Sequence, residues 1–178
     1  MKPSGCKAKG SAFELDVAKA LAKALNISQK KYLQRSPESG ARPVWKGDVV
    51  PVGALVDIWP FHVECKKREG WDLYQVMCDE TGKSEPLQWF IEACEQAYDT
   101  EKVPLIVFAR NFRPWLIAYP FELYRPTSVR AIMNVKVSYT QKRSKVLTIV
   151  PFKAFIDDFL KVVYLPKVQE IGISEAQD

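Results

Sequence analysis

The segment Phe61-His-Val-Glu-Cys-Lys66 constrains the fold most strongly, because apolar and polar residues alternate along it. Successive side chains of a β-strand point to opposite faces of the sheet, so one face of this strand is apolar. The other face carries Glu64 and Lys66 side by side. Buried alone, each of these charges would destabilise the fold by roughly several kcal/mol. The two side chains are therefore expected to pair with each other, to lie at a solvated edge, which the following Lys67 and Arg68 would suit, or to belong to a site.

The remaining segments predict a central mixed β-sheet flanked by helices, which is the α/β class. Helical spacing of apolar residues predicts helices over about 11–25, 84–98 and 152–163. Apolar or alternating runs predict further strands at about 48–52, 103–109, 115–119, 130–138 and 145–151. Turn residues, hydroxyls and positive charge indicate a loop over 35–47. We expect a flexible basic arm over residues 1–10 and a frayed polar tail at the C-terminus.

Positive charge is concentrated in the N-terminal third of the chain. The net charge is +5, but residues 1–50 hold ten basic and four acidic side chains, whereas the rest holds 16 and 17. A localised excess of this kind attracts phosphate backbones, although it also suits a solubilising surface. No apolar run approaches the roughly 20 residues that cross a bilayer, and no apolar segment of a signal peptide follows the N-terminal lysines. We therefore expect a cytoplasmic protein without a membrane partner, in its own cell or in a host.

Cysteine and histidine usage argues against several kinds of site. The four cysteines show no paired short spacing, and His62 is the only histidine. Structural zinc sites usually need two closely spaced ligand pairs, and disulfide frameworks belong mainly to secreted proteins. A Ser-His-Asp or Cys-His mechanism would have to use His62, which lies in the predicted strand. We expect neither a zinc site, a disulfide framework nor a histidine-activated nucleophile.

Asp48 indicates a role for the Glu64–Lys66 pair. It opens the predicted strand that precedes the pair, so pairing of the two strands would bring its carboxylate beside Glu64. Two carboxylates and a backbone carbonyl, here that of Cys65, form an all-oxygen site of the kind that Mg²⁺ prefers. A lysine alongside can orient water or stabilise charge on a phosphate, as metal-assisted phosphodiester hydrolysis requires. Asp57 is a competing ligand, but the seven residues before Glu64 leave little room for two strands and a turn.

Asp48 followed by Glu64-Cys65-Lys66 after an apolar strand resembles the D…ExK core of the PD-(D/E)xK nucleases. Lys9-Gly10-Ser11-Ala-Phe-Glu14 ahead of an amphipathic helix is similar to the opening of the archaeal-type Holliday junction resolvases and their phage relatives. The loop Arg35-Ser36…Ser39-Gly40 and the paired strands around 104–115 fit the same family. The resemblance covers about residues 9–120 and implies a restriction-endonuclease-like fold.

The resemblance implies roles for the core residues. Asp48 and Glu64 would bind the metal together with the Cys65 carbonyl, and Lys66 would be the catalytic lysine. The metal would be Mg²⁺, and Mn²⁺ is expected to substitute for it. The usual proline before the aspartate is replaced by Gly47, a common departure from the pattern.

The resemblance also implies roles outside the core. Glu14 would reach the metal directly or through water, unless it only forms a capping box with Ser11. Either Ser36 or Ser39 would contact the phosphate near the cut. Gln96 lies where related nucleases often place a glutamine near the site, but solvent exposure is the preferred interpretation of this residue.

Several basic residues are candidates for neutralising DNA phosphates, because they surround the proposed site in the sequence. These candidates are Lys9, Arg35, Arg42, Lys46, Lys67, Arg110 and Arg113. An ordinary charged turn would explain the last two as well. Trp71 and Trp89 are expected in the core or at a dimer interface.

The implied function is that of a Mg²⁺-dependent, structure-selective DNA endonuclease that resolves four-way junctions in recombination or repair, as a two-fold homodimer. The alternatives are a general repair- or restriction-type nuclease of the same core and a non-catalytic DNA-binding protein that keeps the fold. We expect a nuclease core over 1–125, an extension packed on it over 126–165, and a tail over 166–178.

Overall fold

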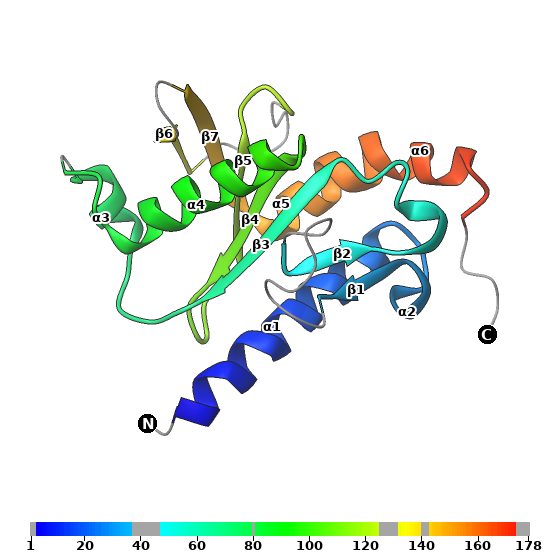
Figure 1. The fold of residues 1–178 in the computed structure, drawn as a ribbon, viewed down its shortest axis with the longest axis horizontal. Helices are drawn as coiled ribbons and strands as arrows, with labels where there is room; N and C mark the ends of the chain where they lie inside the picture. The colour runs from blue at the N-terminus through cyan, green and yellow to red at the C-terminus, as the bar shows by residue number, and fades with distance from the viewer. Residues whose placement is uncertain (1–2, 37–46, 80, 125–131, 140–142, 174–178) are drawn as a thin grey trace.

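Strands from along the whole chain build the centre of the molecule, as the computed structural model shows (Figure 1). The structure describes residues 3–36, 47–79, 81–124, 132–139 and 143–173. The strands are β1 (Leu33–Arg35), β2 (Val49–Pro51), β3 (Phe61–Lys67), β4 (Val103–Ala109), β5 (Leu116–Pro120), β6 (Met133–Tyr139) and β7 (Arg143–Pro151). They form one sheet in the order β1-β2-β3-β4-β5-β7-β6, in which only β3 and β4 run parallel among the described pairs. This is the mixed sheet that the sequence predicts.

Helical segments flank the sheet. They are α1 (Pro3–Ala24), α2 (Gln29–Tyr32), the 3₁₀ turn η1 (Gly53–Leu55), α3 (Leu73–Met77), α4 (Glu85–Asp99), α5 (Phe152–Phe155), the π-helical η2 (Ile156–Tyr164) and α6 (Leu165–Glu170). A parallel pair needs a crossover connection, and α4 lies in the connection from β3 to β4. Within the described residues, no helix combines the length and apolarity that crossing a membrane requires.

The two central strands separate two hydrophobic cores. Val63 and Cys65 of β3 lie in the core shared with α1 and the C-terminal helical segment. Phe108 of β4 lies in the other core, with Trp89 and Phe90 of α4. Because β4 is buried on both faces, its sequence is an uninterrupted apolar run, as is typical of a strand in a parallel pair. Alternate residues of β4 therefore face opposite cores, with Val107 in one and Phe108 in the other.

Helix α1 begins earlier than the sequence predicts. The expected flexible arm over 1–10 is wrong from Pro3 onward, because the helix begins there with proline in its first turn. Lysine and alanine are good helix formers, and each interspersed glycine opposes the helix by only about 1 kcal/mol. Ser11 lies inside the helix, so it does not cap it with Glu14. At the other end, Asn26 adopts a left-handed conformation (φ 53°) and the Ile27 N–H donates to the Ala22 carbonyl, which together form a Schellman motif.

Helix α4 presents a different face to the core than the predicted stripe of Leu87, Ile91, Cys94 and Tyr98. Its buried residues are Pro86, Trp89, Phe90, Ala93, Cys94 and Ala97. The indole and phenyl rings bury more apolar area than the leucine and isoleucine, so they determine how the helix is rotated. Trp71 packs edge-to-face on Trp89 at 5.8 Å between ring centroids, which places both tryptophans in this core.

The C-terminal third adds β6 and β7 to the same sheet, and its helical segment packs on the α1 side. The expected tail over 166–178 is wrong for its first part, because α6 continues to Glu170. Val168 and Ile173 are both buried, and this apolar anchoring explains why the chain does not fray there.

Replacing Phe108 by alanine should lower the free energy of unfolding by about 3–5 kcal/mol, because the fully buried ring packs against Trp71 and Phe90. The matched control is Phe112→Ala in the turn that follows β4, where the ring is completely exposed. That variant should stay within about 0.5 kcal/mol of the parent. Urea unfolding followed by circular dichroism measures both changes, and equal effects of the two substitutions would contradict this account of the core.

Candidate active site

Two backbone-anchored hydrogen bonds hold Asp48 against β3. The Asp48 N–H donates to the Val63 carbonyl at 2.8 Å, and the Asp48 Oδ2 accepts from the Cys65 N–H at 2.8 Å. The carboxylate is therefore fixed at the peptide between Glu64 and Cys65. Asp57, the competing ligand, lies exposed in the turn that leads into the other end of β3.

Gly47 allows this close approach of β2 and β3. Its φ is +114°, a left-handed value that side chains disfavour. A Cβ at this position would lie 3.1 Å from the Val63 carbonyl oxygen and 3.4 Å from the His62 ring. A glycine in place of the family's usual proline is therefore required by the geometry before Asp48.

Negative charge accumulates around Asp48. The pKa of its carboxyl is raised to about 7, chiefly by burial and then by the carboxylates of Glu64 and Glu14, against the opposing effects of the Cys65 N–H hydrogen bond and the Lys66 charge. Three carboxylates from α1, the start of β2 and β3 thus act on one another. A buried carboxylate with this pKa lacks sufficient positive charge around it, and a divalent cation supplies such charge.

Lys66 lies beside Glu64 on the polar face of β3. Its Nζ is 2.8 Å from Glu64 Oε1 and 3.8 Å from Glu92 Oε2 on α4. Burial lowers the pKa of Lys66, but the charge and hydrogen bond of Glu64, together with the charges of Asp48 and Glu92, outweigh burial and raise the pKa above its ordinary value. Lys66 therefore carries its proton at neutral pH and serves as a donor and a positive charge.

Strand β1 brings two further predicted residues to the site. The Arg35 Nε lies 2.6 Å from Glu14 Oε2, and the Ser36 N–H donates to the Asp48 carbonyl at 2.9 Å. Arg35 was expected to contact DNA, but in this structure it pairs with a carboxylate of the site. The structure thus brings Glu14, Asp48, Glu64, Lys66 and Ser36 into one neighbourhood.

The predicted DNA-binding residues do not all lie beside the carboxylates of the site. Lys9 is exposed on α1, and Arg113 is exposed in the turn between β4 and β5. The Lys67 ammonium lies 5.6 Å above the Phe13 ring of α1, whereas the Arg110 Nε lies 4.0 Å from Glu69. Three predicted residues lie outside the described residues; these are Ser39, Arg42 and Lys46.

Two residues at the site were not predicted to have a role there. Glu92 reaches Lys66 from α4, one helical turn before Gln96. His62 is buried, and its Nε2 lies 3.8 Å from Glu64 Oε2. The signal for His62 was its place two residues before Glu64 on a strand, which puts both side chains on one face.

The oxygen donors present suit a hard divalent cation. Among the residues that the structure describes, no three His, Cys, Asp or Glu side chains are grouped as they would be around a bound metal. The donor chemistry nevertheless fits Mg²⁺, because a partly buried Asp48 with a raised pKa faces two other carboxylates. The residues available as ligands are Asp48, Glu64 and Glu14, with the Cys65 carbonyl.

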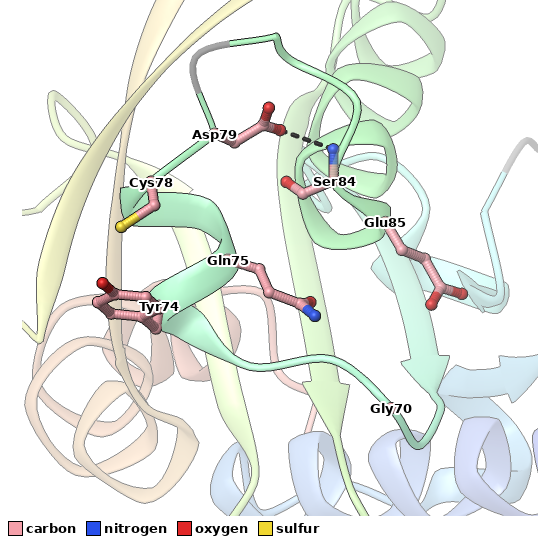
Figure 2. A pocket seen from close by; sticks show the side chains of 7 residues that line it. All are labelled: Gly70, Tyr74, Gln75, Cys78, Asp79, Ser84 and Glu85. Atoms are coloured by element: carbon pink, nitrogen blue, oxygen red, sulfur yellow. Dashed lines mark hydrogen bonds between the residues drawn. The ribbon is translucent and has the colours of Figure 1, made fainter.

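A separate open pocket lies between α3 and the start of α4 (Figure 2). Its lining residues are Gly70, Tyr74, Gln75, Cys78, Asp79, Ser84 and Glu85. Figure 2 shows the Asp79 carboxylate turned toward the backbone of Ser84, whose N–H donates to it at 2.6 Å. Asp79 therefore holds the connection before α4 in shape, and this pocket contains none of the predicted site residues.

Comparison with known proteins identifies the class. The chain matches a family model described as "Phage putative PDDEXK endonuclease" over residues 5–165. The chain therefore belongs to this family of endonucleases, which confirms the resemblance to the PD-(D/E)xK nucleases seen in its sequence. Among solved structures, it is similar to Hjc of Archaeoglobus fulgidus, a Holliday junction resolvase, with 13% identity and a TM-score of 0.37 over 82% of this chain and 91% of Hjc. The family assignment rests on the sequence match alone, and no curated protein matches the chain.

Replacing Asp48 by asparagine should stabilise the metal-free protein at high pH. Folding raises the pKa of Asp48 to about 7, so ionisation of this carboxyl opposes folding. The penalty is absent below about pH 4, grows as the pH rises, and is complete above about pH 7, where it reaches at most about 4 kcal/mol. Asparagine keeps an acceptor oxygen for the Cys65 N–H and removes the charge.

Urea unfolding of both proteins in chelator, at pH 4 and at pH 8, measures this difference. The asparagine variant should match the parent at pH 4 and exceed it at pH 8. A variant that is less stable than the parent at pH 8 would show that the ionised carboxylate stabilises the fold, contrary to the arrangement described.

Proposed function

We propose that this protein is a Mg²⁺-dependent endonuclease that hydrolyses phosphodiester bonds in branched DNA, with Asp48, Glu64 and Lys66 at its active site. Membership of the endonuclease family supports the reaction class. The observation that carries the assignment of residues is the Asp48 carboxylate held by the Cys65 N–H, with Glu64 and Lys66 on either side of that residue. Two carboxylates, those of Asp48 and Glu64, therefore lie near the protonated Lys66, at the start of β2 and on the adjacent β3.

The cation would be held by Asp48 and Glu64, with Glu14 and the Cys65 carbonyl as further oxygen donors. When bound, Mg²⁺ or Mn²⁺ supplies positive charge that stabilises the transition state of phosphodiester hydrolysis and activates water. The carboxylates themselves provide hard oxygen ligands, which select these cations over softer ones. Asp48 is positioned for this role before any cation arrives, because both of its hydrogen bonds to β3 come from or go to backbone atoms.

Lys66 would act on the DNA phosphate. Because it is protonated at neutral pH, its ammonium can donate a hydrogen bond to a phosphate oxygen and stabilise the negative charge that develops there. Glu64 and Glu92 keep its side chain beside the site. Either Ser36 or Ser39 would contact the same phosphate.

Four-way junctions are the first substrate to test. The sequence resemblance of residues 9–14 and 35–40 to junction resolvases supports this choice, as does the positive charge of residues 1–50. We propose that Lys9, Lys67 and Arg113 bind flanking phosphates, together with Arg42 and Lys46. We also propose that residues 1–125 form the nuclease core and 126–165 support it, and that two copies act as a homodimer on junctions of matching symmetry.

Glu64→Gln should lower the rate of DNA cleavage by about 100-fold or more, because it removes a charge needed to hold the cation. The test incubates a synthetic four-way junction and its linear duplex arms with Mg²⁺, with Mn²⁺ and with chelator. Paired, symmetric nicks on the junction are expected from the parent protein. Asp57→Asn is the matched control, since it removes an exposed acidic charge outside the site, and it should cut at the parent rate.

The outcomes separate the candidate functions. Equal cutting of junction and duplex would indicate a general repair- or restriction-type nuclease instead. Tight DNA binding without cleavage by any divalent cation would indicate a non-catalytic DNA-binding protein, and full activity of Glu64→Gln would refute the proposed site.

Mn²⁺ or Mg²⁺ alone should raise the melting temperature of the protein, because a ligand that binds only the folded state stabilises it by mass action. At a cation concentration ten times the dissociation constant, the shift should be about 3–6 °C. Asp48→Asn should abolish this shift, and Asp57→Asn should retain it. Differential scanning calorimetry with and without chelator measures the effect, and identical shifts in both variants would place the cation elsewhere.

A further inference from the structure

The turn between β4 and β5 exposes a phenylalanine in an unusual conformation. The Phe112 ring is completely exposed, and its φ is +58°, in the left-handed region that bulky residues rarely adopt. Four residues earlier, Phe108 is fully buried in the core. The Phe112 ring, by contrast, contributes no buried surface, so packing does not explain an aromatic residue at the tip of this turn.

The turn is attached to the strand that carries the candidate active site. Beyond the end of β3, the Arg68 N–H donates to the Ala109 carbonyl at 3.2 Å, and Glu69 Oε1 accepts from the Asn111 N–H at 2.6 Å. Glu69 Oε2 also lies 4.0 Å from the Arg110 Nε. Asn111, the residue before Phe112, is thus held by Glu69, which lies two residues after the end of β3.

The turn follows the end of β4 that pairs with the end of β3 (Figure 1). Trp115, just after the turn, packs on Phe13 of α1 with 5.0 Å between ring centroids. Lys67 pairs with Ala109, so the turn begins one residue beyond that pair. From Glu64 to Phe112 the path is about 10–20 Å at the rise of an extended strand. At about 3.4 Å per nucleotide, this corresponds to within roughly six nucleotides of a phosphate at the site.

Several basic residues lie close to the exposed ring in the chain. Arg110 and Arg113 flank it in the turn, and Arg68 and Lys67 lie at the adjoining end of β3. The acidic side chain at this place, Glu69, is occupied by the Asn111 N–H and by Arg110. Exposed aromatic rings combined with basic side chains are how proteins bind single-stranded DNA, since the cations contact the phosphates and the ring stacks on a base.

We infer that Phe112 stacks on a base whose face is exposed at a branch point, within roughly six nucleotides of the cleavage site, so that the preferred substrate is DNA with unstacked bases. The position beside the cut rests on the proposed function, whereas the stacking itself does not. In a continuous duplex the faces of the bases are covered by their neighbours, and a ring at the tip of a turn has no base face to contact. The turn would therefore select branched over linear DNA without reading sequence.

The test measures binding in chelator, where no cleavage takes place, by fluorescence anisotropy of a four-way junction and of a linear duplex. A 2-aminopurine at the branch point reports whether the base becomes unstacked. Phe112→Ala should bind the junction about 5- to 100-fold more weakly, bind the duplex within twofold of the parent, and lose the 2-aminopurine signal. Phe112→Tyr should restore both. The matched control is Tyr74→Ala, which removes an exposed aromatic ring from α3 (Figure 2).

Several outcomes would overturn the inference. These are equal junction binding by Phe112→Ala and the parent, an equal loss in Tyr74→Ala, or no binding of the parent to any DNA. A loss of binding that accompanies loss of a dimer in light scattering would make Phe112 a subunit contact instead. Cleavage with Mg²⁺ is measured separately, so selective junction binding by a parent that cuts nothing would sustain the stacking role and refute the proposed nuclease.

Discussion

The hydrogen bond from the Cys65 N–H to the Asp48 carboxylate is the interaction on which the candidate site depends. It joins two segments that are 17 residues apart, and it holds the Asp48 side chain against the central strand through a backbone donor. Gly47 allows the backbone before Asp48 to lie close to β3. On the other side, the Ser36 N–H donates to the Asp48 carbonyl, which connects the end of β1 to the same residue. Residues from α1, β1 and β3 are thereby collected around one carboxylate.

The parts of this arrangement that depend on local periodicity could be predicted from the sequence. The alternation in β3 placed Glu64 and Lys66 on one face, and the apolar run of β4 marked a strand buried on both sides. Asp48 could be preferred over Asp57 from chain length alone, because seven residues cannot hold two strands and a turn. The mixed sheet and the endonuclease family follow from these few segments, and the roles of the individual site residues stay predictions.

The parts that depend on packing between distant segments could not be predicted. The rotation of α4 follows from two adjacent rings, Trp89 and Phe90, competing for the core, and this rotation brings Glu92 to Lys66. The pairing of Arg35 with Glu14 requires β1, whose three residues are too few to show any period. The start of α1 was missed because glycines suggested flexibility, although helix propensity is summed over many residues.

The ion pairs of Arg35 with Glu14 and of Lys66 with Glu64 affect how the protein folds in the absence of a divalent cation. Each basic side chain acts as an internal counter-ion, so two of the three site carboxylates are matched within the chain, and Asp48 retains the unmatched charge. The fold can consequently assemble before it meets any divalent ion. A divalent ion that bound these oxygens would compete for them with Arg35 and Lys66, so the two cationic groups would become available to a phosphate.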